Sequence, residues 1–189
     1  MHDLWLLKQN VSVKPDDVLI AELIGLAPGV QTWRAMEDGL TYFYLPSHAS
    51  PVNEPPVTRA DWRRLVCLQE FNSASSHQDA PYHYVVETDV LPEYEEDLNA
   101  WYAQEHLPGL AAVPGTLRAA RYIDASGSPR YYACYDLANL DTLGSPAWLE
   151  VRKTAWSSKV RPAFRNTRRT MFRKAMAEPQ NGGLIGQAC

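Results

Sequence analysis

The chain repeats a short pattern around two Pro-Gly turns, and this repeat limits the folds open to it. Pro28-Gly29 follows one apolar, helix-like stretch, Pro114-Gly115 follows another, and strand-like residues come after each pair. Strand-like runs also precede the two helical stretches, at 4–9 and at 82–88. The same order of elements in both halves predicts a tandem duplication of one structural unit.

Each half continues with a second strand-like run beyond its Pro-Gly turn, at 39–45 and at 130–136. Strand, helix, turn, strand and strand form the opening of a βαββαβ, or ferredoxin-like, unit. The remaining predicted elements are a helix over 146–151 and a strand over 169–173 in the second half, and a helix over 59–68, capped by Thr58, in the first. We therefore expect an α+β fold of two tandem ferredoxin-like units.

Small and polar residues mark the boundary between the two halves. Residues 73–81 have the composition of a linker, which separates a first unit over 1–72 from a second unit over 82–177. Residues 178–189 contain a Gly-Gly pair and are predicted to form a flexible tail.

The charge and the apolar content of the chain exclude several classes of function. The 189 residues carry a net charge of −4, with a pI of about 5.7, which argues against a nucleic-acid surface. No apolar run approaches the roughly 18 residues of a membrane helix, and no basic segment precedes an apolar run at the N-terminus. We expect a cytoplasmic protein with neither a nucleic acid nor a membrane as partner.

The spacing of cysteines and histidines predicts no metal site. Cys67, Cys134 and Cys189 form no C-x-x-C pair, and the five histidines show neither H-x-H nor H-x-x-x-H spacing. The cysteines are interpreted as reduced thiols. Neither a G-x-S-x-G motif nor a glycine-rich phosphate loop occurs, so a serine hydrolase and a nucleotide site are not indicated.

Basic residues dominate one segment of the second half. Residues 151–174 contain nine lysines and arginines and no acidic residue. One interpretation is a solvated basic face that balances acidic segments elsewhere. The other is a surface that attracts anionic substrates.

The run WYAQEHLP over 101–108 carries the strongest chemical signal in the chain. Pro92 and the acidic residues after it mark the start of the helix that leads into this run. Because Pro108 disfavours helical geometry at the residue before it, we expect the helix to kink or end close to His106.

Two interpretations of this run stay open on the residues alone. His106 either stabilises a helix C-terminus through the helix dipole or acts as a proton-transfer group. Trp101 and Tyr102 either pack in the core or line an apolar pocket beside that group.

At these residues the chain resembles the dimeric α+β barrel superfamily and, within it, the EthD-like proteins, whose first helix carries Trp-Tyr, Glu-His-Leu-Pro and Pro-Gly. The resemblance covers about 82–175, and residues 4–70 resemble the same unit in degenerate form, without the histidine. In that superfamily two ferredoxin-like units pair their sheets into a barrel, either as a homodimer or within one fused chain. The resemblance therefore implies a barrel with one asymmetric site per chain.

The resemblance also implies roles for individual residues. His106 is expected to be the general acid or base, and Tyr102, one turn earlier, to orient it or a substrate oxygen. The expected substrate-binding residues are Trp101, Tyr84, Tyr122, Tyr131, Tyr135 and Arg121.

Strand alternation and alternative roles limit this set. Because side chains alternate along a strand, Tyr131 and Tyr135 share one face and Tyr132 takes the other. Arg118 and Arg121 are candidates for binding a carboxylate, but a role as surface or ion-pair residues is favoured for both. His83, inside a predicted strand, is expected to make a local hydrogen bond.

Three functions remain open from the sequence. We favour a cofactor-independent enzyme of the lyase, isomerase or cyclase type, acting on a small hydrophobic, oxygenated aromatic or enone-like compound. The alternatives are a cofactor-free monooxygenase of the same fold and a non-enzymatic ligand-binding or stress-related protein. No cofactor is expected, although heme is an alternative because the superfamily has heme-binding branches. A homodimer also stays open.

Overall fold

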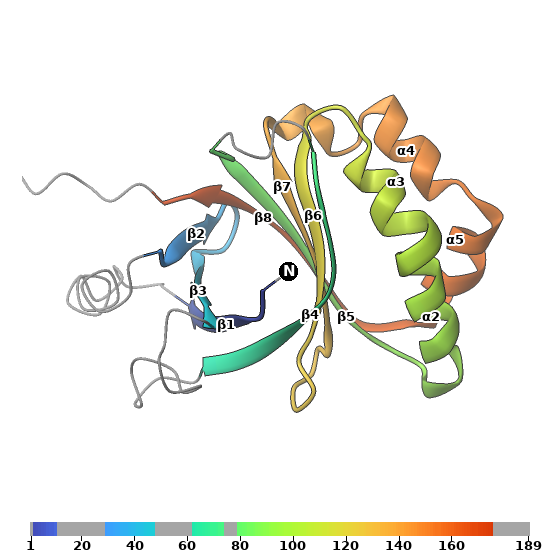
Figure 1. The fold of residues 1–189 in the computed structure, drawn as a ribbon, viewed down its shortest axis with the longest axis horizontal. Coiled ribbons are helices and arrows are strands. Elements are labelled where there is room, and N and C mark those ends of the chain that lie inside the picture. Colours follow the sequence, from blue (N-terminus) through green and yellow to red (C-terminus); the bar gives the residue numbers. More distant parts are fainter. Residues whose placement is uncertain (1, 11–28, 48–61, 74–78, 176–189) are drawn as a thin grey trace, which may run out of the picture.

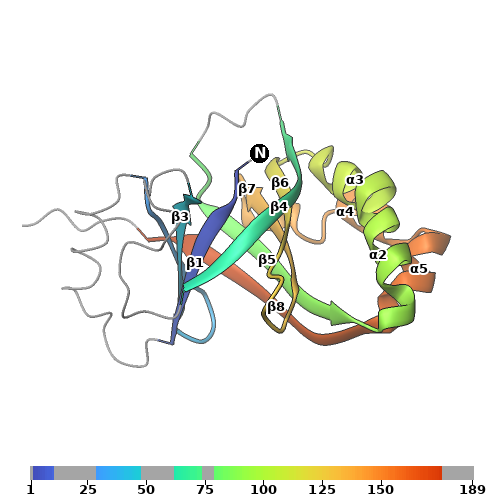
Figure 2. The same ribbon diagram turned by 60° about the horizontal axis from the view of Figure 1, so that its bottom comes forward.

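Eight antiparallel strands close into a barrel in the part of the chain that the computed structural model describes, residues 2–10, 29–47, 62–73 and 79–175 (Figures 1 and 2). The strands are β1 (Leu4–Asn10), β2 (Gln31–Ala35), β3 (Leu40–Pro46), β4 (Trp62–Asn72), β5 (Tyr82–Val90), β6 (Thr116–Ile123), β7 (Tyr131–Leu137) and β8 (Phe164–Lys174). Their order around the barrel is β1-β3-β2-β8-β5-β7-β6-β4, and β4 pairs with β1 to complete the ring.

The two halves of the chain have the same strand order. In the first half the order is β4-β1-β3-β2, and in the second it is β8-β5-β7-β6, so each last strand lies beside the first strand of its own half. This is the order of a ferredoxin-like sheet, and the predicted fold class is confirmed. Pairing of β2 with β8 and of β4 with β6 joins the two sheets, so a single chain completes the barrel.

Helices cover the outer face of the second sheet (Figure 1). The helical segments are η2 (Pro92–Tyr94), α2 (Glu95–Trp101), η3 (Tyr102–His106), α3 (Leu107–Ala111), η4 (Leu140–Thr142), α4 (Pro146–Arg152), α5 (Ala155–Val160) and η5 (Arg161–Ala163). The helix expected over 146–151 is present as α4. Among the described residues, no helix has the length and apolar character needed to cross a membrane.

The predicted helix over 59–68 is wrong for the residues that the structure describes. Residues 62–72 form β4, which pairs with β1 on one side and with β6 on the other. Leu65 is fully buried while Val66 and Leu68 are exposed, as expected for a strand that turns one face into the barrel. The apolar spacing of this segment suits a helix as well, and barrel closure decides between them. Thr58 lies outside the described residues.

Other sequence expectations fall partly outside the described residues. The helical stretch expected before Gly29 is not described, and neither is the segment predicted to form the tail, from 178 on. Of the predicted linker, Ser73 and residues 79–81 are described, and they belong to no strand or helix. The unit boundaries remain a prediction.

Apolar side chains fill both faces of the second sheet. The inner face packs inside the barrel with the first sheet, where Leu6, Trp33, Tyr42, Tyr132 and Phe172 are buried. The outer face packs under the helices. The core between these two layers includes Tyr135 from the sheet and, from the helices, Leu98, Trp101, Leu107, Trp148 and Val160. Tyr132 and Tyr135 thus lie on opposite faces of β7, as alternation predicts.

A buried carboxylate ties the two halves together inside the barrel. Glu87 on β5 is 2% exposed, and it accepts a hydrogen bond from the Lys8 ammonium of β1 at 2.5 Å and another from the Tyr42 hydroxyl of β3. Lys8 also lies over the rings of Tyr42 and Tyr132, with its nitrogen 5.2 and 4.8 Å from their centroids. Glu87 and Lys8 depend on each other, because removal of either charge leaves the other buried without a counter-ion.

We predict that Glu87→Gln lowers the free energy of unfolding by about 3 kcal/mol, because Lys8 then loses its buried counter-ion. The measurement is equilibrium unfolding in denaturant. The control is Glu150→Gln, which breaks the exposed Glu150–Lys153 pair and should change stability by no more than about 1 kcal/mol. Equal stability of the two variants would contradict the role given to Glu87.

Candidate active site

The helix that carries His106 contains one wide turn. Residues Tyr102–His106 form a π-helical turn in which the Leu107 N–H donates to the Tyr102 carbonyl, five residues earlier. The helix then continues to Ala111. Pro108 explains the wide turn, because proline has no N–H and its ring clashes with the carbonyl four residues before it. The helix therefore bulges and continues instead of ending, and the interpretation of His106 as a C-terminal dipole partner is wrong.

The wide turn brings His106 against Trp101. In a regular α-helix two residues five apart point about 140° away from each other, whereas here their rings stack with centroids 4.1 Å apart and planes at 19°. Tyr102 meets the same imidazole edge-on at 5.3 Å. The Trp101 indole donates to the Glu105 carboxylate at 3.1 Å, and the Thr154 hydroxyl donates to the same oxygen at 2.5 Å. These bonds hold the aromatic wall in place.

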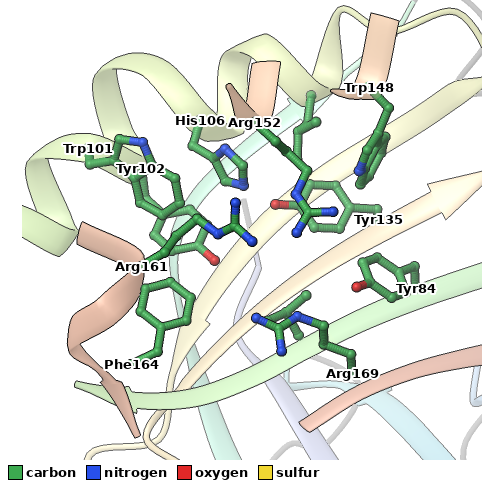
Figure 3. Close-up of a pocket in the computed structure, with 12 residues that line it drawn as sticks. Tyr84, Trp101, Tyr102, His106, Tyr135, Trp148, Arg152, Arg161, Phe164 and Arg169 are labelled. Atoms are coloured by element: carbon green, nitrogen blue, oxygen red, sulfur yellow. The ribbon is translucent and has the colours of Figure 1, made fainter. Parts of the chain in front are cut away.

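A small cavity lies beside His106, between the helices and the outer face of the second sheet (Figure 3). Its volume is about 30 Å³, room for about two water molecules. The aromatic residues that line it come from both layers and are Tyr84, Trp101, Tyr102, Tyr135, Trp148 and Phe164. Five predicted site residues, His106, Tyr102, Trp101, Tyr84 and Tyr135, therefore meet at one cavity.

Three buried polar groups of this cavity have no hydrogen-bond partner in the described residues. They are Nδ1 of His106, the hydroxyl of Tyr135 and the indole nitrogen of Trp148, on side chains that are 7%, 1% and 1% exposed. Buried polar groups nearly always have a partner, so these three groups leave hydrogen-bonding positions at the cavity that water or a polar ligand can fill.

Burial and nearby charge keep the ring of His106 neutral. Burial is the largest cause that lowers the pKa of His106 to about 3, followed by the positive charges of Arg152 and Arg161. Burial also raises the pKa of Tyr84 and of Tyr135, so both phenols stay protonated. At neutral pH the cavity thus holds one neutral base among hydrogen-bond donors.

Three arginines complete the lining. Arg152 is the last residue of α4, Arg161 is the first of η5, and Arg169 lies on β8. In Figure 3 the guanidinium groups of Arg152 and Arg161 point toward the His106 ring. Most basic side chains of residues 151–174 are exposed, as a solvated basic face predicts, and attraction of anions by this segment stays a prediction. These arginines were missed as individual site residues, because nothing in the sequence tells which of nine basic residues face inward.

Arg121 and Tyr131 pack behind the cavity and do not line it. The Arg121 guanidinium is 3% exposed and lies between the rings of Tyr102 and Tyr131, at 4.4 and 4.5 Å from their centroids. The Tyr131 hydroxyl donates to Glu95 at 2.5 Å. Arg121 therefore supports Tyr102 from behind.

Tyr122 is separated from the other predicted residues. It neighbours Arg121 in β6, so it points to the opposite face of the sheet, into the barrel. There its hydroxyl accepts from Arg118 at 3.0 Å. Arg118 also donates to Asp136 at 2.7 Å, which matches the ion-pair interpretation of this arginine.

A second cavity, of about 230 Å³, lies on that inner face, lined in part by Tyr44, His83, Arg118, Tyr122 and Cys134. His83 is hydrogen-bonded there on both sides, to Asp136 at 2.6 Å and to the Tyr44 hydroxyl at 3.3 Å. The expected local hydrogen bond of His83 is thus present. Although this cavity is larger, its histidine has partners, whereas His106 has none at Nδ1, so we place the candidate site at His106.

Within the described residues no group of three or more histidine, cysteine or acidic side chains is arranged to hold a metal ion. Cys67 and Cys134 are free thiols, and Cys189 lies outside the described residues.

Comparison with known proteins identifies the fold. No family model and no curated protein matches the chain. A Fusobacterium nucleatum protein provisionally assigned as a monooxygenase has a similar structure, with 11% identity, 91% coverage of each chain and a TM-score of 0.64. A regulator of staphylococcal pathogenesis gives 9% identity, coverage of 92% of this chain and 99% of its own, and a TM-score of 0.61. A heme-degrading enzyme from Listeria monocytogenes gives 10% identity, coverage of 90% and 98%, and a TM-score of 0.54.

The chain has the dimeric α+β barrel fold. At these levels of identity the similarity shows the fold alone. The narrower EthD-like resemblance stays a prediction.

We predict that His106 makes the protein less stable in mild acid. Because its pKa is about 3 in the folded chain and about 6.5 in an unfolded chain, both states are neutral above pH 6.5. As the pH falls from 6.5 toward 3, the unfolded state alone binds the proton, and stability falls by up to about 1.4 kcal/mol per pH unit. Denaturant unfolding of the wild type and His106→Gln at several pH values measures this. Parallel stability curves for the two proteins would refute it.

Proposed function

We propose that the protein is a cofactor-independent enzyme that transfers a proton on a small oxygenated compound, with His106 as the base. The observation that carries this proposal is the buried, neutral imidazole whose Nδ1 lacks a partner at the edge of a cavity. A neutral imidazole is the protonation state that can accept a proton. Lyases, isomerases and cyclases of this kind need one base and a means to stabilise the anion that forms.

The phenols around His106 suit that second task. Removal of a proton from carbon beside a carbonyl group places negative charge on the carbonyl oxygen. Tyr84 and Tyr135 are protonated donors that line the same cavity, and the Tyr135 hydroxyl has no other partner among the described residues. A preorganised donor in a site shielded from water stabilises such an oxyanion more than water does.

Tyr102 and Trp101 have positioning roles in this proposal. Trp101 stacks on the imidazole and limits its rotation, and Tyr102 packs edge-on against the same ring. Arg121 packs on the far side of the Tyr102 ring and keeps it in place. Since Tyr131 stands behind Arg121, it belongs to this support and not to the substrate contacts.

Heme does not fit the cavity next to His106. The similarity to a heme-degrading enzyme makes this test relevant. One face of the imidazole is covered by Trp101, its edge by Tyr102, and the adjoining space is only about 30 Å³. An axial ligand needs a free approach to a ring nitrogen and room for the macrocycle, and His106 has neither.

A cofactor-free oxygenase is the second candidate. The fold similarity to a provisionally assigned monooxygenase favours it. The same carbanion, formed at a CH₂ group, would add dioxygen to give a peroxide, and loss of water from that peroxide breaks the second C–H bond and the O–O bond, so that CH₂ and O₂ give C=O and H₂O. The site residues would keep the roles given above, so the two candidates differ in the need for dioxygen.

We predict that His106→Gln slows proton exchange on a bound carbon acid by about 10²- to 10⁴-fold, the usual contribution of a general base. The measurement is incorporation of deuterium from D₂O into a panel of small aromatic ketones and enones, followed by NMR. The control is Gln104→Ala, an exposed residue on the same turn, which should exchange at the wild-type rate. Equal rates for wild type and His106→Gln would remove His106 from the mechanism.

We predict that turnover of a substrate found in this way continues without dioxygen. Isomerisation or elimination needs no oxidant, so rates in anaerobic and air-saturated buffer should agree. Consumption of dioxygen in proportion to product, measured with an oxygen electrode, would support the oxygenase instead. If no compound turns over and ligands still bind, the protein is a binding protein.

A further inference from the structure

The three arginines at the cavity lack the acidic partners that several other described arginines have. Arg152, Arg161 and Arg169 make neither a side-chain hydrogen bond nor an ion pair within the described residues, and no acidic residue lines the cavity. Other arginines of the second unit are paired, among them Arg118 with Asp136, Arg130 with Glu95 and Arg168 with Asp38. Positive charge at this cavity is therefore left uncompensated.

The uncompensated charges act on one another. Burial lowers the pKa of Arg161, and the charges of Arg152 and Arg169 lower it further. Like charges held close together repel one another, and an anion placed among them turns that repulsion into attraction. They come from three separate elements, α4, η5 and β8, so their convergence is a property of the fold and not of a local run.

We infer that the substrate of the proposed reaction is an organic anion whose carboxylate, or an equivalent planar oxyanion, is held by Arg152, Arg161 and Arg169. The inference rests on the proposed function for the identity of the ligand as a substrate. Guanidinium groups bind planar carboxylates through paired hydrogen bonds, which lysines cannot do. The aromatic walls formed by Trp101 and Trp148 suit an apolar body attached to that anion.

The size of the cavity agrees with a ligand that is only partly enclosed. About 30 Å³ admits the reacting group beside the imidazole, and the carboxylate lies among the guanidinium groups at the entrance. Arg169 is exposed and Arg152 and Arg161 are half-buried, so rotamer changes of these long side chains widen the entrance. The buried walls need not move.

Anion binding also changes the strength of the base. The titratable groups that line the cavity with His106 are three arginines and three tyrosines, Arg152, Arg161, Arg169, Tyr84, Tyr102 and Tyr135. Two of these arginines contribute to the low pKa of His106. A bound carboxylate offsets their charge, so the pKa of His106 rises by the part that the arginines had lowered, although burial, the larger cause, still keeps it below the ordinary value.

Binding of benzoate tests the inference, with neutral benzamide as its isostere. Fluorescence of the cavity tryptophans and calorimetry report both ligands. We expect benzoate to bind more tightly than benzamide, with an affinity that falls as NaCl is added. Arg161→Gln should weaken benzoate binding about tenfold or more, the effect of losing one hydrogen bond to a charged group. Equal affinities for benzoate and benzamide would overturn the inference.

The control variant is Arg173→Gln, on the same face of β8 as Arg169 but outside the cavity, where its guanidinium lies over the Tyr82 ring. It changes the net charge by the same amount and should leave benzoate binding unchanged. If it weakens binding as much as Arg161→Gln does, general attraction explains the effect and the site is refuted. Arg161→Lys keeps the charge and should retain part of the affinity.

A measurement on the wild type needs no variant. Saturating benzoate should raise the pKa of His106, followed by NMR of its ring protons, and an unchanged pKa contradicts the site. His106→Gln should still bind benzoate. Binding without deuterium exchange on any carboxylate would then refute the proposed function and leave the anion site intact. Exchange on neutral compounds that Arg161→Gln does not slow would refute the anion inference alone.

Discussion

Strand pairing at two seams, β2 with β8 and β4 with β6, determines where chemistry can take place in this chain. The seams turn two four-stranded sheets into a barrel in which every described strand has two neighbours. Alternation along each strand then divides the side chains between a closed interior and an outer face that helices cover. Inside, charged groups are paired, as Glu87 is with Lys8. Buried groups without a partner occur on both faces of the second sheet, and those of His106, Tyr135 and Trp148 lie on the outer face, under the helices.

The position of His106 follows from one covalent constraint. Pro108 cannot complete a regular turn, and the helix widens over Tyr102–His106 to accommodate it. Without the wide turn, Trp101 and His106 would point in different directions, and the imidazole would not stack on the indole. Packing of the indole, fixed by Glu105, then keeps the imidazole at the cavity. A residue that itself touches no ligand thus sets the geometry of the site.

Much of the fold was predictable from the sequence, because repeated patterns recorded it twice. The strands expected at 4–9, 39–45, 82–88, 130–136 and 169–173 are all present, and the predicted barrel closes within one chain. The helix predicted over 59–68 was wrong for the described residues because their apolar spacing fits a helix and a strand equally. Pairing with β1 and β6 in the barrel makes residues 62–72 a strand. Tyr122 was grouped with Arg121, although adjacent strand residues cannot share a face. The inward-facing arginines depend on tertiary structure, which no local pattern encodes.

The two cavities of the barrel show what distinguishes a scaffold from a site. In the inner cavity His83 has a partner at each ring nitrogen, and Arg118 bonds to both Asp136 and Tyr122. Such a network adds stability and already engages both ring nitrogens of His83. At the outer cavity three arginines and the buried polar groups of His106, Tyr135 and Trp148 have no hydrogen-bond or ion-pair partner within the described residues, and the proposed anion would supply one to the arginines. Natural proteins tolerate such local conflicts where function requires them. We therefore favour the smaller cavity as the candidate site, because a ligand there would supply the hydrogen bonds and the negative charge that the described residues do not.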